Sequence, residues 1–245
     1  MLRRYSDAFG FLTVIPLFKS RAMEDAELAR SMAAFPLVGA TLGLALALLH
    51  HWLFHRLPPP LEGALIVCLL AWATGGFHLD GVADTADGLG GSLNRVRSLE
   101  IMKDSRIGAL GAIALIAVML LKAAGYGYLP AQLAVPALIC TPAIGRGLAV
   151  YMAFGVPYAR ASGGLGKPYA EQLSWPTMTA ALLFAALLSL LAGWRGAAAF
   201  GATLLWVIIL KYYFNRRLGG ITGDILGFAE ETGEAIFLVS LQLFL

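Results

Sequence analysis

The chain has 245 residues, of which 59% are hydrophobic and 13% charged, and its formal net charge at pH 7 is +3. Its mean hydropathy is +0.75. A soluble domain normally carries about 25% charged residues, so this composition leaves too few charges to cover a water-facing surface. The small net charge and the lack of a basic run exclude nucleic acid as an expected partner. We therefore expect an all-α polytopic protein in a lipid bilayer, with residues 1–245 forming a single integral membrane domain.

The first predicted element is a short apolar stretch from Ala8 to Leu17. It resembles the apolar part of a signal peptide, but Pro16, Lys19 and Arg21 stand where a small-residue cleavage site would be needed. We expect this segment to be retained as an N-terminal interfacial helix.

Apolar stretches near the length of a spanning helix, about 20 residues, follow along the chain. They cover residues 33–54, 61–79, 108–125, 130–154, 176–193, 196–214 and 225–245. Turn-forming residues separate them, as at Pro58-Pro59-Pro60 and Gly219-Gly220. The sequence thus predicts a bundle of about seven transmembrane helices.

Lys and Arg are distributed unevenly between the connecting segments. Alternate segments carry 14 of them on one side and three on the other, namely Arg56, Lys122 and Arg195, while Arg146 lies inside a span. Because cytoplasmic loops are enriched in Lys and Arg, this bias predicts a cytoplasmic N-terminus and an external C-terminus. Two groups of acids fall on the same cytoplasmic side, and since acids contribute little to topology, their shared location indicates a site.

The first acidic group lies in residues 75–91, which read GGFHLDGVADTADGLGG. Asp80, Asp84 and Asp87 are spaced i, i+4 and i+7, so they share one face of a helix. Like charges at this spacing destabilise a helix, and a bound cation removes that penalty. Mg²⁺ takes oxygen ligands and usually retains waters and substrate phosphates. The pattern predicts a magnesium site, with the adjacent glycines allowing close approach of a ligand; the apolar neighbours argue against a solvated loop.

The second acidic group begins the last predicted helix, where Asp224, Glu231 and Glu234 share a face. Ionisable groups drawn toward a membrane usually face a polar interior. The alternative is a helix N-terminus whose acids suit its dipole, which explains Glu230 alone. The full predicted set of metal ligands is Asp80, Asp84, Asp87, Asp104, Asp224, Glu231 and Glu234.

Basic residues on the same side indicate a phosphate-bearing substrate. Arginine suits bidentate binding of phosphate oxygens, and glycine-rich turns such as residues 160–168 present backbone N–H groups to anions. The predicted phosphate-binding residues are Lys103, Arg106, Arg146, Arg160 and Lys167. The alternatives are membrane anchoring for the lysines and Arg160, and a structural ion pair for Arg146. His78, two residues before Asp80, is predicted either to orient a ligand or act as a base, or to be a packed histidine.

The motifs HLDGVADTADG, MKDSRIG and GGITGDILG, with the early FLTVIP and the final EETGEAIFL, resemble the cobalamin synthase family over nearly the whole chain. That family is also called adenosylcobinamide-GDP ribazoletransferase. The resemblance implies a magnesium-dependent, multi-pass enzyme of the inner membrane whose active site faces the cytoplasm. It would join adenosylcobinamide-GDP to α-ribazole or α-ribazole 5′-phosphate and release GMP. It leaves open a homo-oligomer or association with other enzymes of the cobalamin pathway.

Within this reading, Mg²⁺ held by the three aspartates of residues 80–87 would bridge the pyrophosphate while the ribazole hydroxyl attacks the phosphorus nearer the cobinamide. The second acidic group would hold a second ion or supply the base, and His78 is the other candidate for the base. The expected catalytic residues are Asp84, Asp87, His78 and Glu231.

Other membrane proteins fit the residues less well. The CDP-alcohol phosphotransferase motif, D-G-x-x-A-R, requires Ala-Arg where this chain has Asp84-Thr85, and the N-D-x-x-D pattern of aromatic prenyltransferases is absent from the sequence. A transporter would place its site near the bilayer midplane, often within inverted repeats. The acids here gather at one predicted face instead.

Overall fold

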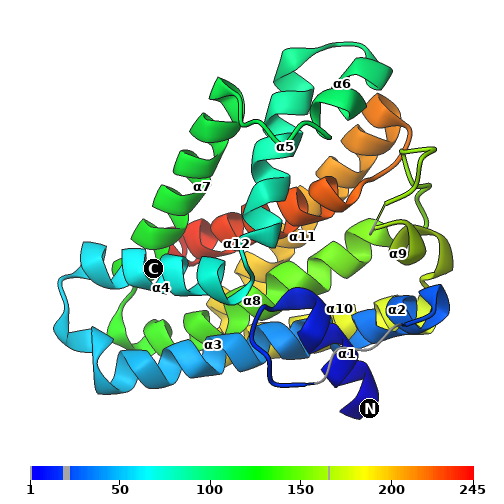
Figure 1. The fold of residues 1–245 in the computed structure, drawn as a ribbon. Coiled ribbons are helices and arrows are strands. Elements are labelled where there is room, and N and C mark those ends of the chain that lie inside the picture. The colour runs from blue at the N-terminus through cyan, green and yellow to red at the C-terminus, as the bar shows by residue number, and fades with distance from the viewer. Residues whose placement is uncertain (1, 19–22, 165) are drawn as a thin grey trace.

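The computed structural model describes residues 2–18, 23–164 and 166–245, and in these ranges the regular elements are helical (Figure 1). Lys19 and Arg21 lie outside the described residues. The α-helices are α1 (Leu2–Leu12), α2 (Asp25–Ser31), α3 (Phe35–Trp52), α4 (Pro59–Ala73), α5 (Phe77–Gly91), α6 (Arg95–Ile101), α7 (Ala109–Gly127), α8 (Ala131–Ala153), α9 (Lys167–Gln172), α10 (Trp175–Ser189), α11 (Gly193–Leu218) and α12 (Gly223–Leu243). Short 3-10 helices cover Met32–Ala34, Phe54–Arg56 and Leu190–Ala192. The all-α class is confirmed.

Four helical segments of the described chain have the length and hydropathy to cross a membrane, or five if α4 and α5 count as one bent span. The predicted count of seven is therefore not confirmed. The run from Trp175 to Leu218 counts as one of the four, although Gly193, with φ +64°, interrupts it between α10 and α11. The last predicted span, α12, does not qualify because its acids lower its hydropathy.

The second predicted span, residues 61–79, is wrong in its C-terminal part. α4 ends at Ala73, and α5 leaves it at an angle of 95°. Gly75 and Gly76 have φ of +63° and +71°, backbone conformations that glycine adopts without steric penalty. This bend turns α5 upward from the layer of α3 and α4 in Figure 1. It also separates the aspartates of α5 from the apolar α4.

The first helix is confirmed, but it ends at Leu12, before the predicted limit of Leu17. Ala8, Phe9 and Leu12 of α1 are buried in the core. Beyond them the chain leaves the helix, and the N–H of Val14 donates to the carbonyl of Ala73. Its placement at a membrane interface stays a prediction.

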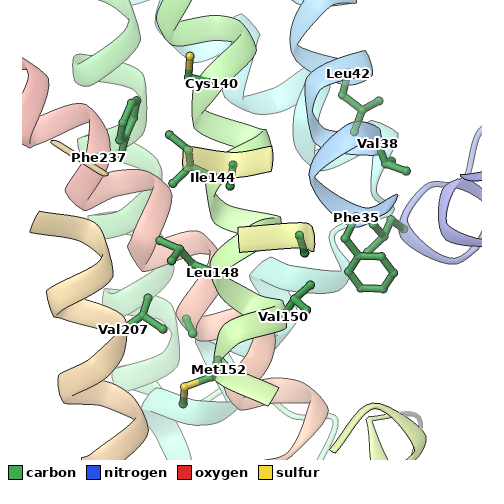
Figure 2. Packing of buried hydrophobic residues seen from close by; sticks show 14 of the residues in the cluster. Phe35, Val38, Leu42, Cys140, Ile144, Leu148, Val150, Met152, Val207 and Phe237 are labelled. Atoms are coloured by element: carbon green, nitrogen blue, oxygen red, sulfur yellow. The ribbon is translucent and has the colours of Figure 1, made fainter. Parts of the chain in front are cut away.

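The core is organised around α8, which lies between α3 on one side and α11 and α12 on the other (Figure 2). Ile144 and Leu148 of α8 are fully buried, as are Val207 of α11 and Phe237 of α12. On the α3 side, Gly39 lies against the backbone of Pro142 and Gly43 against that of Leu138. Glycines four residues apart let membrane helices approach backbone to backbone, so the α3–α8 pair has little room for larger side chains.

The outward faces of several helices are apolar. On α7, the exposed side chains include Ile113, Ile116 and Leu120, and on α10 they include Leu183 and Leu187. Large contiguous apolar surfaces are unusual on soluble monomers. Together with the spanning segments, they establish a membrane protein whose described helices present apolar faces outward.

Candidate functional site

α5 presents the first acidic group as predicted. The helix runs from Phe77 to Gly91, so Asp80, Asp84 and Asp87 project from one side of it. Asp80 is exposed, while Asp84 and Asp87 are half-buried. Within the described residues, Asp80 and Asp84 have neither a hydrogen-bond nor a salt-bridge partner. The two carboxylates are therefore free to bind a ligand.

Asp224 of the second acidic group approaches the first group because α5 and α12 cross at two glycines. A Cβ added to Gly81 would lie 2.5 Å from the carbonyl oxygen of Asp224, and one added to Gly227 would lie 2.9 Å from that of His78. The crossing brings Asp224 into electrostatic range of Asp80 and Asp84. We call Asp80, Asp84 and Asp224 the acid face.

The glycines next to the aspartates do not serve the predicted purpose. They were expected to admit a ligand, but the space beside Gly81 is filled by the backbone of Asp224 and that beside Gly88 by Met102. The prediction is wrong because a small residue on a helix also admits a second helix. The close approach is made by protein, and it sets the distance between the acidic groups.

Asp87 has a separate structural task. It accepts hydrogen bonds from the N–H groups of Gly108 at 2.7 Å and Gly111 at 2.8 Å, which lie at the start of α7. The first N–H groups of a helix have no partner within the helix, and a carboxylate is well suited to them. Asp87 thus attaches α7 to α5, and both of its oxygens already accept a hydrogen bond.

Arg160 connects the acid face to a group of cations. Its Nη2 lies 2.5 Å from Oδ2 of Asp224 and 3.2 Å from the carbonyl oxygen of Met102. Asp224 lies in the first turn of α12, where Thr222 caps the helix by accepting from the N–H of Ile225. The cap and the ion pair together fix the carboxylate opposite α5.

Two clefts are lined by residues of the acid face and by Arg160, respectively. The first, of about 480 Å³, is lined by Asp80 and Asp84 together with Ser105 and apolar side chains of α5 and α7. The second, of about 400 Å³, lies between α6 and residues 159–162. Its lining residues are Arg95, Val96, Leu99, Glu100, Lys103, Ala159, Arg160, Ala161 and Ser162. We call the second one the basic cleft.

The other predicted phosphate-binding residues on the surface are placed differently. Arg106 binds Asp104 through several hydrogen bonds, and these lower the pKa of Asp104 to about 2. Asp104 is therefore an ionised, arginine-paired carboxylate rather than a free ligand. Lys167 begins α9 and lies 3.9 Å from Glu171, with its side chain 45% exposed.

The remaining predicted residues lie in a buried ion network between α5, α7, α8 and α12. Lys122 Nζ is 2.5 Å from Glu231 and 2.6 Å from Glu234. Arg146 Nη1 is 3.1 Å from both Glu234 and Glu230, and His78 Nδ1 is 2.9 Å from Glu230. The members of this network are His78, Lys122, Arg146, Glu230, Glu231 and Glu234.

This network bears on several predictions. Lys122 was expected in an outer loop, which is wrong: it lies in α7 and is 2% exposed. Arg146 takes the arrangement of the structural ion pair that was its alternative reading. Glu231 and Glu234 face protein cations, so their predicted metal and catalytic roles stay predictions. Buried charges of this kind require partners, since desolvation of an unpaired charge is unfavourable.

Comparisons with known proteins agree with these motifs. The family model for cobalamin-5-phosphate synthase matches residues 4–242. An adenosylcobinamide-GDP ribazoletransferase of Geotalea daltonii is 38% identical over 98% of this chain and 97% of its own length. Proteins of the same name from Acinetobacter baumannii and Citrobacter koseri are 37% and 40% identical, each over 93% of its own length. No solved structure shows a significant match.

The chain belongs to the cobalamin-5-phosphate synthase family. The resemblance read from the sequence is confirmed, and with it the class of protein, an enzyme of cobalamin biosynthesis.

The donor set of this cobalamin-5-phosphate synthase family member fits a divalent cation. Asp80 and Asp84 offer free oxygens, and Asp224 adds a third carboxylate across the helix crossing. Hard cations such as Mg²⁺ take such ligands and complete their shell with water and phosphate. Among the residues that the structure describes, no three acidic, histidine or cysteine side chains converge as a closed ligand group. Asp80, Asp84 and Asp224 are the described residues that would hold such a cation.

Sequence reasoning missed two residues of the basic cleft. Arg95 begins α6 and lines the cleft, and Ser162 accepts a hydrogen bond from Lys103 Nζ at 2.8 Å. The glycine-rich stretch around residue 162 is visible in the sequence, but its proximity to α6 is a contact between residues 59 positions apart. No local pattern shows such a contact.

Proposed function

We propose that the protein is a magnesium-dependent adenosylcobinamide-GDP ribazoletransferase, which joins adenosylcobinamide-GDP to α-ribazole or α-ribazole 5′-phosphate and releases GMP. The observation that carries this proposal is the acid face lying directly beside the basic cleft, with Arg160 shared between them. A pyrophosphate substrate needs this combination of a metal-binding face and fixed cations. The names of the relatives supply the substrates.

In this proposal, Asp80, Asp84 and Asp224 hold Mg²⁺, which when bound neutralises charge on the pyrophosphate and polarises the phosphorus under attack. Arg160, fixed by Asp224 and by the carbonyl of Met102, donates to a phosphate oxygen and offsets charge that develops as GMP leaves. A ribazole hydroxyl forms the new bond to the phosphorus nearer the cobinamide. Its proton passes to a carboxylate of the acid face, and the bond to GMP breaks.

Of the four residues predicted to be catalytic, Asp84 is best placed. Asp87 accepts two backbone N–H groups. Glu231 pairs with Lys122, and His78 lies against Glu230. Asp84 alone among these four is free of hydrogen bonds and salt bridges within the described ranges.

We also propose that the protein resides in the inner membrane with this site at the cytoplasmic face. The cations around the site support the orientation, because Lys and Arg accumulate on cytoplasmic segments. Those on α6 and the loops beside it include Arg95, Arg97, Lys103, Arg106 and Arg160. Lys122 is buried in α7, so it does not count among the cations of the opposite side. The excess of Lys and Arg on the cytoplasmic side is then larger.

The reaction is tested with purified protein in detergent, given adenosylcobinamide-GDP and α-ribazole phosphate. We expect GMP release that requires both substrates, stops in EDTA and returns when Mg²⁺ is added in excess. The corrinoid product should gain the ribazole base. A folded protein that releases GMP equally well in EDTA would contradict the magnesium proposal, and one that releases none would contradict the transferase proposal.

The helix crossing gives a second prediction. Gly81→Ala is expected to lower turnover about tenfold to 100-fold, because its Cβ would push α12 and Asp224 away from α5. The matched control is Gly201→Ala on α11, where a Cβ meets no neighbouring atom within 4 Å. GMP release is compared at equal amounts of folded protein, measured by circular dichroism. Equal activity of the two variants would show that the crossing distance is unimportant.

A further inference from the structure

The basic cleft contains more positive charge than the proposed pyrophosphate site uses. Arg160 is committed to Asp224 at its inner end. Lys103 Nζ contacts the hydroxyl of Ser162 at 2.8 Å, and within the described chain it forms no salt bridge. Glu100 is the acid that lines the cleft, and it pairs with Arg97 at 3.0 Å. Among the described residues, the ammonium of Lys103 therefore has no carboxylate partner.

Arg95 is a second cation of the cleft, and it has no acidic partner among the residues that the structure describes. Its guanidinium packs over Gly219, which has φ +70°: a Cβ there would lie 2.7 Å from Arg95 Cζ. Its one hydrogen bond in the described structure is to the carbonyl oxygen of Ala159, at 3.4 Å. The side chain of Arg95 is thus held by packing on the backbone of Gly219, and its other N–H groups are available to bind a ligand. Two cations and a hydroxyl around one open cleft are suited to a phosphate.

The size and the lining of the basic cleft indicate which phosphate-bearing ligand it binds. Its volume of about 400 Å³ is typical of sites for nucleotide-sized ligands and too small for a corrinoid. Val96, Leu99, Ala159 and Ala161 give it apolar walls beside the cations. The base of α-ribazole is a benzimidazole and is largely apolar, whereas the guanine of the donor requires hydrogen-bonding groups along its edge. A phosphate monoester also carries about −1.5 to −2 charges at pH 7, more than each phosphate of a pyrophosphate diester.

We infer that the basic cleft binds the 5′-phosphate of the incoming α-ribazole phosphate, with Arg95 and Lys103 as the residues that select the phosphorylated acceptor. This inference rests on the proposed function and adds the acceptor subsite to it. The acceptor enters from the open side of the cleft, where Arg95 and Lys103 are exposed. Its ribose then lies toward Arg160 and the acid face, where the donor pyrophosphate is held.

The test compares kcat/KM for α-ribazole phosphate and for unphosphorylated α-ribazole, with adenosylcobinamide-GDP as the donor. The wild-type protein is expected to prefer the phosphorylated acceptor. Arg95→Met and Lys103→Met should each reduce that preference about tenfold, since each removes a charge-assisted hydrogen bond to the phosphate. Lys103→Arg should restore most of it. The KM for adenosylcobinamide-GDP should change much less than the preference.

Arg216→Met is the control, because it removes one exposed positive charge from α11, where the guanidinium lies over the ring of Tyr212 and does not line the cleft. The preference of this variant for the phosphorylated acceptor should equal that of the wild type. The inference is overturned if the wild type does not prefer the phosphorylated acceptor, or if the Arg95 and Lys103 variants lose activity equally with both acceptors. A raised KM for the donor would assign the cleft to its guanosine instead.

Failure of the proposed function gives a different result, namely no GMP release by the wild type with either acceptor. To cover variants that fold poorly, binding of α-ribazole phosphate is also measured by calorimetry without the donor. The wild-type protein should bind it at least tenfold more tightly than α-ribazole. Equal affinities for the two compounds would overturn the inference independently of any variant.

Discussion

Replacing Asp84 by asparagine is expected to lower GMP release about 100-fold or more, with little change in thermal stability. Asp84 is half-buried, lies within electrostatic range of Asp80 and Asp224, and has no hydrogen bond or salt bridge in the described structure. An amide keeps the size of the side chain but removes its charge. Loss of one metal-binding carboxylate removes several kcal/mol of charge stabilisation, and about 1.4 kcal/mol corresponds to a factor of ten in rate.

The measurement is a magnesium titration of GMP release, because a weakened metal site should also require more Mg²⁺ for half-maximal rate. Asp25→Asn, which removes an exposed carboxylate from α2, serves as the control and should behave as the wild type. Near-normal turnover of the Asp84 variant in saturating magnesium would remove Asp84 from both the metal site and the chemistry.

Replacing Asp87 by asparagine tests whether the role of Asp87 is structural, in contrast to the chemical role proposed for Asp84. Asp87 accepts from the N–H groups of Gly108 and Gly111, so an amide placed there turns an N–H donor toward one of them. We expect this variant to lose thermal stability, unlike the Asp84 variant. Two variants with the same melting temperature and the same loss of turnover would contradict the division of roles.

Replacing Lys122 by methionine is expected to cause the largest loss of stability. Lys122 is 2% exposed, and its ammonium lies within 2.6 Å of both Glu231 and Glu234. Methionine fills the space of the aliphatic stem but leaves two buried carboxylates without this partner. Breaking a buried ion pair from one side typically destabilises a protein by about 3–5 kcal/mol. Thermal unfolding in detergent, followed by circular dichroism, should show a clearly lower midpoint.

A second substitution tests whether the buried carboxylates that lose their partner cause this loss of stability. Lys122→Met combined with Glu231→Gln removes one positive and one negative charge together, so it should recover part of the lost stability. Lys167→Met is the matched control: its partner Glu171 is 3.9 Å away and the lysine side chain is 45% exposed. It should melt within a degree or two of the wild type. A Lys122 variant as stable as this control would show that the buried network contributes little.

Much of the candidate site could be predicted from local patterns. The i, i+4 and i+7 spacing placed Asp80, Asp84 and Asp87 on one helical face, since helical geometry alone decides which side chains share a side. The same argument assigned helices to most apolar stretches. It did not give the number of spans, because length and hydropathy do not reveal the break at Gly75 and Gly76, where α4 ends and α5 departs at 95°.

By itself, then, the sequence determined the membrane class, the helical faces and, through its combined motifs, the family. Only the tertiary structure decided which helical faces pack against each other. Lys122 pairs with Glu231, which is 109 residues away, and Gly81 admits the backbone of Asp224 rather than a ligand. Arg160 joins the acid face to a cleft that includes Arg95. The physical reason is that periodicity fixes the direction of a side chain from its own helix, whereas its partner is set by packing between helices distant in the chain.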